Sequence, residues 1–270
     1  MIMNLKALAF VPLFFVVIAL IILANNLAET GSIISRDVEL SGGKQISFEI
    51  KGGNVDALKD SFPYAKFNVA EGAVKTLLAE IPFDKDENAV ISYIKANFRV
   101  EGEPSVRNIG PALGTVFWQQ TQTAFAVALI MMSLLVFILY RSLVPSILII
   151  LSAVSDIIII IAVLSVMGID FSLPILGALL MVLGYGTDNN ILLTSHMLKF
   201  KSAALGDVFR TSVMMYATTA CALVSVYVVS GSFVLQQISL TLLIGLIVDM
   251  PVTWLTNAGL LGMWIERHGR

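Results

Sequence analysis

Three aspartates occupy the middle of three apolar stretches that are long enough to cross a lipid bilayer. Asp156, Asp188 and Asp249 each lie in a different stretch, and none of these stretches contains a Lys or Arg. An ionised aspartate at the centre of a membrane helix costs roughly 3 kcal/mol, so all three cost about 9 kcal/mol unless they are protonated, hydrated or paired. Acidic residues that destabilise the membrane helices by this much predict a function inside the membrane, with proton exchange as the chemistry.

The composition is typical of a polytopic membrane protein. Hydrophobic residues make up 57% of the 270 residues, charged residues make up 13%, and the mean hydropathy is +0.87, whereas soluble domains carry about 25% charged residues. The net charge of -2 gives no electrostatic reason to bind nucleic acid. The single cysteine, Cys221, excludes an intramolecular disulfide. Neither a metal site nor a cofactor is expected.

Charge divides the chain into three parts. Residues 25–118 hold ten of the seventeen Lys and Arg and thirteen of the nineteen acids, which predicts a soluble domain that interrupts the hydrophobic sequence. Residues 1–24 are predicted to form the first transmembrane helix, and residues 119–270 to form helices two to six. A span needs roughly 20 residues to cross hydrocarbon. The predicted spans are 8–24, 121–140, 145–166, 173–195, 211–230 and 236–262.

The short connections predict the orientation of the chain. The first span is expected to be an uncleaved anchor, because its apolar run exceeds the roughly 7 to 15 residues of a signal peptide core. The connections at residues 168–170 and 230–232 carry no Lys or Arg. The positive-inside rule therefore predicts a multi-pass protein of the cell membrane with both termini cytoplasmic and the soluble domain outside. The basic residues assigned to the cytoplasmic side are Lys6, Arg141, Lys199, Lys201, Arg210, Arg267 and Arg270.

Apolar patterns within residues 25–118 predict an α+β domain. Ile46, Phe48 and Ile50 alternate as in a half-buried strand, and residues 55–62 have helical spacing. Strands at 67–69, 73–81 and 105–109 and a helix at 86–97 complete the pattern, although residues 73–81 fit a helix equally well. The order strand, helix, strand, strand, helix, strand predicts a ferredoxin-like domain.

Two features of the later spans bring polar groups into the membrane. Pro251 lies inside span six, two residues after Asp249, and is expected to interrupt the helical hydrogen bonds and kink the helix there. The freed carbonyl groups either line a hydrated cavity or only shape the packing. Span four holds Asp188, Asn189 and Asn190 in succession. A helix with polar groups on several sides must be central in the bundle, and Asp188 is its predicted functional acid.

Several motifs share one resemblance. Span four contains Gly184-Tyr185 followed by the Asp and Asn residues, span five begins with Arg210-Thr211, and residues 239–245 of the last span read Ser-Leu-Thr-Leu-Leu-Ile-Gly. Residues 109–114, Ile-Gly-Pro-Ala-Leu-Gly, lead into span two. Together these motifs resemble the SecF family, and residues 249–257 are similar to its archaeal members. The resemblance covers nearly the whole chain.

The resemblance implies a fold, a function and partners. The fold is the six-helix half of a resistance-nodulation-division (RND) transporter, with the soluble domain between helices one and two. The function is proton-coupled assistance to preproteins that leave the Sec channel, which is not an enzyme activity. The implied partners are a SecD-like six-helix membrane subunit, a SecYEG-type translocation channel and the secreted preproteins.

The sequence departs from the bacterial pattern of that family in span four. Bacterial members read Gly-Tyr-x-x-Asn-Asp, with an essential acid at the position of Asn189, whereas here the acid is one residue earlier, at Asp188. A shift of one residue turns a side chain by about 100° around a helix. Asp156 and Arg210 resemble an acid of the third helix and an arginine of the fifth helix in the family, although Arg210 also fits an ordinary cytoplasmic anchor.

The predicted mechanism follows from these residues. Asp188, with Asp156 from the preceding helix, exchanges a proton, and the change of charge alters helix packing at the interface with a partner. Arg210 stabilises the ionised form. Asp249, Asn189 and Asn190 belong to the same predicted relay, and Pro251 supplies the helix kink.

Two other functions remain open at the level of the sequence. The main alternative is an RND-type transporter subunit for a small molecule or a lipid. An intramembrane aspartyl protease is less favoured, because its Gly-x-Gly-Asp motif has one residue fewer than Gly184-Tyr185-Gly186-Thr187-Asp188.

Overall fold

The computed structural model describes residues 9–72, 74–200 and 205–268. Lys6, Lys201 and Arg270, which contributed to the predicted orientation, lie outside these ranges. Within them, six helices are long and apolar enough to cross a membrane, as predicted. They are α2 (Phe10–Thr30), α6 (Pro111–Tyr140), α7 (Leu143–Val166), α8 (Leu173–Phe200), α9 (Leu205–Val229) and α10 (Phe233–Pro251), the last of which continues through a π-helix, η1 (Val252–Asn257), into α11 (Ala258–His268).

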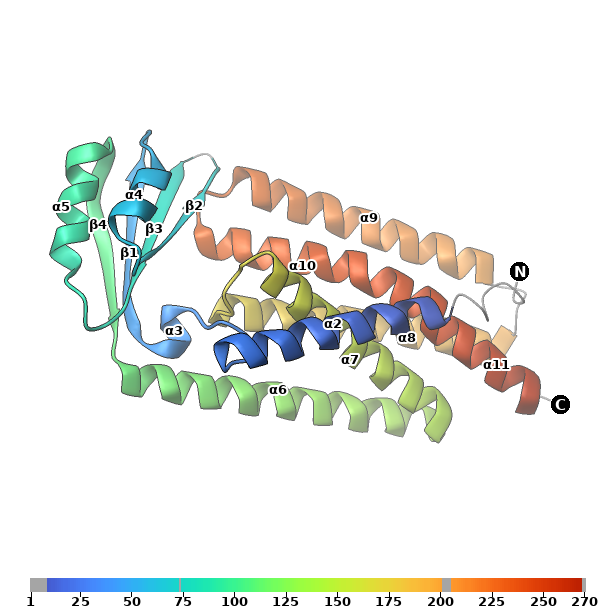
Figure 1. Cartoon of the computed structure of the whole chain (residues 1–270). Helices are drawn as coiled ribbons and strands as arrows, with labels where there is room; N and C mark the ends of the chain where they lie inside the picture. Colours follow the sequence, from blue (N-terminus) through green and yellow to red (C-terminus); the bar gives the residue numbers. More distant parts are fainter. Residues whose placement is uncertain (1–8, 73, 201–204, 269–270) are drawn as a thin grey trace.

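The second membrane helix is longer than predicted. Its predicted start was residue 121, but α6 begins at Pro111, directly after the N-cap residue Gly110. Proline fits the first turn of a helix, because the missing N–H has no acceptor there. The helix ends at Arg141, which adopts a left-handed conformation with φ 49°. With the additional ten residues, α6 reaches the end of the bundle at which the soluble domain lies (Figure 1).

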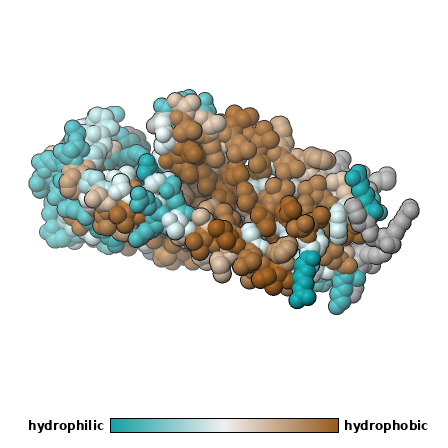
Figure 2. All heavy atoms as spheres, turned by 90° about the horizontal axis from the view of Figure 1, so that it is seen from below, coloured by the Kyte–Doolittle hydropathy of each residue, from teal (hydrophilic) through white to brown (hydrophobic). Residues whose placement is uncertain are grey.

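The centre of the bundle is formed by α7, α8 and α10. Ile157 and Ile160 of α7, Leu179 of α8 and Leu242 of α10 belong to one buried apolar cluster. By contrast, α6 and α9 bury few of their residues. The surface over the bundle is hydrophobic and the surface over the soluble domain is hydrophilic (Figure 2), as expected where one part lies in lipid and the other in water.

The soluble domain, called the outer domain below, lies at one end of the bundle (Figure 1). The start of α2 and the end of α11 lie at the opposite end. A short helix, α3 (Val38–Ser41), precedes a sheet of four antiparallel strands in the order β2-β3-β1-β4. The strands and their helices are β1 (Gly43–Ile50), α4 (Val55–Ser61), β2 (Lys66–Ala70), β3 (Lys75–Ile81), α5 (Glu87–Asn97) and β4 (Val100–Ile109).

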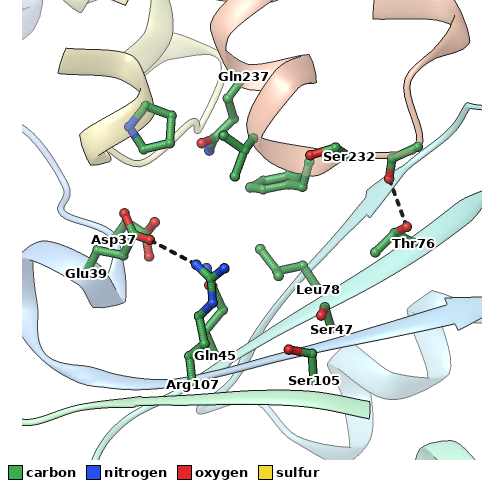
Figure 3. Close-up of a pocket in the computed structure, with 14 residues that line it drawn as sticks. Asp37, Glu39, Gln45, Ser47, Thr76, Leu78, Ser105, Arg107, Ser232 and Gln237 are labelled. Carbon is green, nitrogen blue, oxygen red and sulfur yellow. Dashed lines mark hydrogen bonds and ion pairs between the residues drawn. The ribbon is translucent and has the colours of Figure 1, made fainter. Parts of the chain in front are cut away.

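The sheet has one apolar face and one polar face. Ile46, Phe48 and Leu77 lie in a buried cluster together with Leu58 of α4 and Ile94 of α5, so the two helices cover the apolar face. Of the two alternatives for residues 73–81, the strand is present, over Lys75–Ile81, because its alternating residues complete this cluster. The polar face is turned toward the bundle (Figure 3).

Candidate functional site

Two of the membrane aspartates meet in the core of the bundle. Asp156 lies in the middle of α7 and Asp249 near the end of α10, and their side chains are 2% and 0% exposed. Their carboxyl groups are in hydrogen-bonding contact with each other. Two carboxyl groups in such contact share a proton rather than carry two negative charges. In the part of the chain that the structure describes, no ion pair involves either acid.

Three further helical segments hold the Asp249 carboxylate in place. The Tyr216 hydroxyl of α9 donates a hydrogen bond to one carboxylate oxygen at 2.6 Å, and the Thr253 hydroxyl of η1 donates to the other at 3.0 Å. Asn189 of α8 also hydrogen bonds to this carboxylate. On the same helix, a Cβ added to Gly186 would lie 3.0 Å from an Asp249 oxygen. The Asp249 carboxylate therefore contacts residues of α7, α8, α9 and η1, and these contacts depend on how the four segments are placed relative to one another.

A second polar cluster adjoins the carboxyl pair. The Asn257 amide donates to the Asn190 side-chain oxygen at 2.5 Å and to the Thr194 hydroxyl at 3.4 Å, and the Asn190 amide donates to the Gly186 carbonyl at 2.9 Å. All three side chains are at most 1% exposed. The backbone of Gly186 thus links the two clusters along α8.

The π-helix explains how both clusters receive residues from the last span. Pro251 removes a backbone donor, and the next six residues, Val252–Asn257, adopt π-helical geometry. The α-helical hydrogen-bond pattern therefore ends at Pro251, and the kink stays a prediction. π-Helical segments within α-helices are frequent at functional sites. Here the segment contributes Thr253 to the carboxyl pair and Asn257 to the amide cluster.

Several polar atoms in this core have no hydrogen-bond partner among the described residues. They include one carboxylate oxygen of Asp156 and the side-chain oxygens of Asn189 and Asn257. Buried polar atoms normally find a partner, often an ordered water molecule. No group of His, Cys, Asp and Glu in the described ranges is arranged to hold a metal ion.

The structure does not bring Asp188 and Arg210 into this site. Asp188 is exposed on the outer side of α8, on a stripe with Gly177, Met181 and Gly184. Arg210 is exposed in the first turns of α9. Of the residues predicted for the relay, Asp156, Asp249 and Asn189 therefore come together, Asn190 lies in the adjoining cluster, and Asp188 and Arg210 lie apart.

Sequence reasoning did not identify Tyr216 as a member of the site. Nothing in its local sequence distinguishes it from an interfacial or packing tyrosine. Thr253 carries a clearer signal, because it follows Asp249 by four residues and residues at that spacing share a helix face. Asn257 continues the same spacing.

Comparisons with known proteins agree on one family. The family described as "Protein export membrane protein SecD/SecF, C-terminal" matches residues 90–267. The protein-export membrane protein SecF of Pyrococcus furiosus is 33% identical over 99% of this chain and 94% of its own length. The SecF proteins of Methanolacinia petrolearia and Haloferax volcanii are 29% and 32% identical, each over 98% of this chain and over 95% and 93% of their own lengths.

Solved structures show the same architecture. The crystal structure of SecDF from Thermus thermophilus, described as a translocon-associated membrane protein, matches 98% of this chain with a TM-score of 0.77 and 18% sequence identity. SecDF in its super-membrane-facing form matches 98% with a TM-score of 0.61. This chain covers only 38% of the Thermus chain and 39% of the other, so the solved proteins contain a large part that has no counterpart here.

Proposed function

The chain belongs to the SecF family of protein-export membrane proteins, and from this premise we propose that it assists preproteins as they leave a SecYEG-type channel, driven by an ion gradient. The observation that carries the coupling proposal is the buried Asp156–Asp249 pair, to which α7, α8, α9, α10 and η1 contribute. A pair of acids with no basic partner in the described residues is a costly feature to keep in a membrane. The cost is explained when titration of the pair changes the shape of the bundle.

The proposed cycle alternates between two charge states of the pair. With one shared proton, Asp156 and Asp249 remain in contact. When that proton leaves, two negative charges repel each other in a medium of low dielectric constant, and Asp249 depends on Tyr216 and Thr253 for stabilisation. One proton moving through a potential of 100 mV releases about 2.3 kcal/mol, which shifts a two-state equilibrium by more than tenfold. The movement of α9, α10 and η1 is the proposed output.

The proposed partner is a second, SecD-like subunit with six membrane helices. The stripe Gly177, Met181, Gly184 and Asp188 faces away from this bundle. An acid at mid-membrane is unfavourable against lipid, and small residues permit close helix contact. Both features favour a protein neighbour at α8. That this chain corresponds to 38% of a solved SecDF chain supports the same conclusion.

The proposed orientation places the outer domain on the side where preproteins emerge. The connections nearest to the outer domain, at residues 168–170 and 230–232, lack Lys and Arg, whereas Arg141 and Lys199 lie at the other end. The strand order β2-β3-β1-β4, with all neighbours antiparallel and one helix in each crossover, supports a ferredoxin-like outer domain.

The test is gradient-driven export in membrane vesicles with Asp156→Asn and Asp249→Asn variants. Each substitution keeps the size of the side chain but removes the proton exchange, so the stimulation of export by an imposed proton gradient is expected to fall at least about tenfold. Asp207→Asn, an exposed acid in the first turn of α9, is the matched control and should export normally. Full stimulation in both variants would disprove the role of the pair.

A further inference from the structure

The chain enters and leaves the outer domain through a narrow neck. The chain enters the sheet through Gly42 and Gly43 and leaves it after Ile109, and Gly43 pairs with Ile109 across β1 and β4. Gly42 has φ 84°, and a Cβ on it would lie 2.6 Å from the Pro111 Cα. A Cβ on Gly114 would lie 2.5 Å from the Gly42 nitrogen. The two connections therefore cross backbone against backbone, which gives the outer domain a pivot of small cross-section.

Far from the neck, strands β2 and β3 contact the connection between α9 and α10. The Thr76 hydroxyl donates to the Gly231 carbonyl at 2.9 Å (Figure 3), and the Gln236 amide donates to the Glu71 carbonyl at 2.9 Å. A Cβ on Gly72 would lie 2.1 Å from the Ser230 carbonyl oxygen. The contacts described for this second attachment are hydrogen bonds and close backbone approach.

Two cavities separate the polar face of the sheet from the bundle. The first, of about 240 Å³, lies between Ser47 and Ser105 on the sheet and Gln237 on α10 (Figure 3). The second, of about 190 Å³, lies beside Glu80 of β3. Asp37, just before α3, and Gln237 line both cavities. A polar and incompletely packed interface of this kind is typical of domains that move relative to each other.

Acidic side chains from both sides meet at this interface. Asp37 is 4% exposed and Glu80 is 6% exposed, and one carboxylate oxygen of Asp37 has no hydrogen-bond partner among the described residues. Lys66 of β2 stands opposite Glu80 in the strand register and forms an ion pair with Asp170 of the connection between α7 and α8. The remaining groups that face these acids are Glu39 of α3, Arg107 of β4 at 3.9 Å from Glu39, the amides of Gln236 and Gln237 on α10, and the phenol of Tyr227 on α9.

Burial makes these acids sensitive to pH near neutrality. It raises the pKa of Glu80 to about 8 and that of Asp37 to about 6, and the nearby carboxylates raise both further while Lys66 lowers the pKa of Glu80. Below these values the two groups are neutral and fit the interface. Above them, four carboxylates, those of Asp37, Glu39, Glu80 and Asp170, face two cations among the described residues, Lys66 and Arg107. Deprotonation therefore favours an arrangement in which water reaches the interface.

We propose that the outer domain is a hinged lid, which pivots on the glycine neck and is latched over the bundle by the uncharged forms of Asp37 and Glu80. A high proton concentration on the outer side closes the lid, and a low one opens it and exposes the polar face of the sheet. The described structure is the closed form. This latch lies outside the membrane and does not depend on the Asp156–Asp249 pair, so the two can be tested separately.

The test measures the distance between the outer domain and the bundle in the full chain, reconstituted in lipid nanodiscs. Spin labels are placed at Lys59→Cys on α4 and Val166→Cys on α7, two exposed positions, in a Cys221→Ser background. At about pH 5 a single short distance is expected. Toward pH 9 a longer distance should appear, with its midpoint between the pKa values of about 6 and about 8.

Substitutions test whether Asp37 and Glu80 cause the pH-dependent change in distance. The double variant Asp37→Asn, Glu80→Gln keeps both groups uncharged and is expected to lower the fraction of the long distance at pH 9 by at least about tenfold. Glu49→Gln, an exposed acid on β1, should respond like the parent chain. One pH-independent distance in the parent chain, or an undiminished response in the double variant, would overturn the proposal.

Discussion

At the scale of single residues, burial and donors distinguish Asp249 from Asp188. Asp249 has 0% exposure and receives hydrogen bonds from the Tyr216 and Thr253 hydroxyl groups. Asp188 is exposed. An acid held by donors from several helices can transmit a change of charge to those helices, whereas an exposed acid on one helix acts on whatever lies beside it. We therefore propose that Asp249 couples charge to movement within the bundle and that Asp188 contacts a partner.

The first prediction compares two glycines on α8. In Gly186→Ala, the new Cβ would lie 3.0 Å from an Asp249 oxygen, so we expect a loss of about 1–3 kcal/mol of stability. In Gly184→Ala, the new Cβ meets nothing within 4 Å. Because alanine favours a helix more than glycine does, this variant should be more stable than the parent chain by up to about 1 kcal/mol. Unfolding by SDS in mixed micelles measures both. Equal effects in the two variants would show that Gly186 does not constrain Asp249.

The second prediction concerns the Tyr216 hydroxyl. Tyr216→Phe removes the 2.6 Å hydrogen bond to Asp249, which is worth about 1.5–3 kcal/mol when the acceptor is charged. The lost hydrogen bond stabilises mainly the ionised Asp156–Asp249 pair. We therefore expect weaker gradient-driven export with little change in the amount of folded protein. Tyr140→Phe, which removes a hydroxyl bonded to the Ile191 carbonyl, is the control. Export that is equally reduced in both variants would argue against a specific role for Tyr216.

At the scale of elements, the π-helix η1 contributes side chains to both polar clusters of the bundle. It follows Pro251 and faces Asn190 and Thr194 of α8 through Asn257. A regular α-helix would place residues 253 and 257 on one face, and the wider turn allows each to meet a different cluster. The packing of α8 against η1 is therefore expected to depend on a pair of amides in direct contact.

The third prediction is a double-mutant cycle on these amides. Asn257→Ala leaves the Asn190 oxygen without its donor, and a buried unsatisfied polar group costs about 1–3 kcal/mol. Once Asn190→Ala is present, the further loss from Asn257→Ala should be smaller, which gives a coupling energy of about 0.5–3 kcal/mol. SDS unfolding of the four proteins measures it. Asn88→Ala, an exposed residue of α5, should be additive with Asn257→Ala.

The sequence predicted helices and strands correctly where the pattern of apolar residues alone determines them. Six apolar runs predicted the six membrane helices, and the alternation of Ile46, Phe48 and Ile50 predicted β1. α6 begins ten residues before the predicted span, because hydropathy locates the apolar part of a helix and not its first turn. The pairing of Asp156 with Asp249 was not foreseen, since it depends on how α7 and α10 rotate about their axes. Hydropathy carries no information on that rotation.

At the scale of the whole molecule, the acids between the outer domain and the bundle make stability depend on pH. The folded state raises the pKa of Glu80 from 4.5 to about 8 and that of Asp37 from 3.8 to about 6. Between each pair of values the folded chain binds more protons than the unfolded chain, so stability falls as pH rises. The contribution of these two acids to stability is greatest below about pH 4 and is lost progressively up to about pH 8.

The fourth prediction follows from that sign. The melting temperature of the full chain in detergent should decrease from pH 5 to pH 8. Glu80→Gln should flatten the decrease above pH 6, because the pKa of Glu80 is about 8 and that of Asp37 only about 6. Each group contributes at most roughly 1.4 kcal/mol for each pH unit. Asp60→Asn, an exposed acid on α4, should leave the slope unchanged. A melting temperature that rises with pH over this range would contradict the assigned direction.

The last prediction concerns how this chain meets the proposed second subunit. Gly184→Leu adds bulk to the stripe that contains Asp188, and because a Cβ at Gly184 meets nothing within 4 Å, the isolated chain should be at least as stable as the parent chain. Close helix contact across the stripe would be lost, so the amount of SecD-like subunit that co-purifies should fall by at least about tenfold, or roughly 1.4 kcal/mol. Ile130→Phe adds bulk to α6, where Ile130 is 65% exposed, and is expected to leave co-purification intact. Normal co-purification with Gly184→Leu would place the partner elsewhere, because a leucine side chain at the centre of a tight helix interface cannot be accommodated without separating the helices.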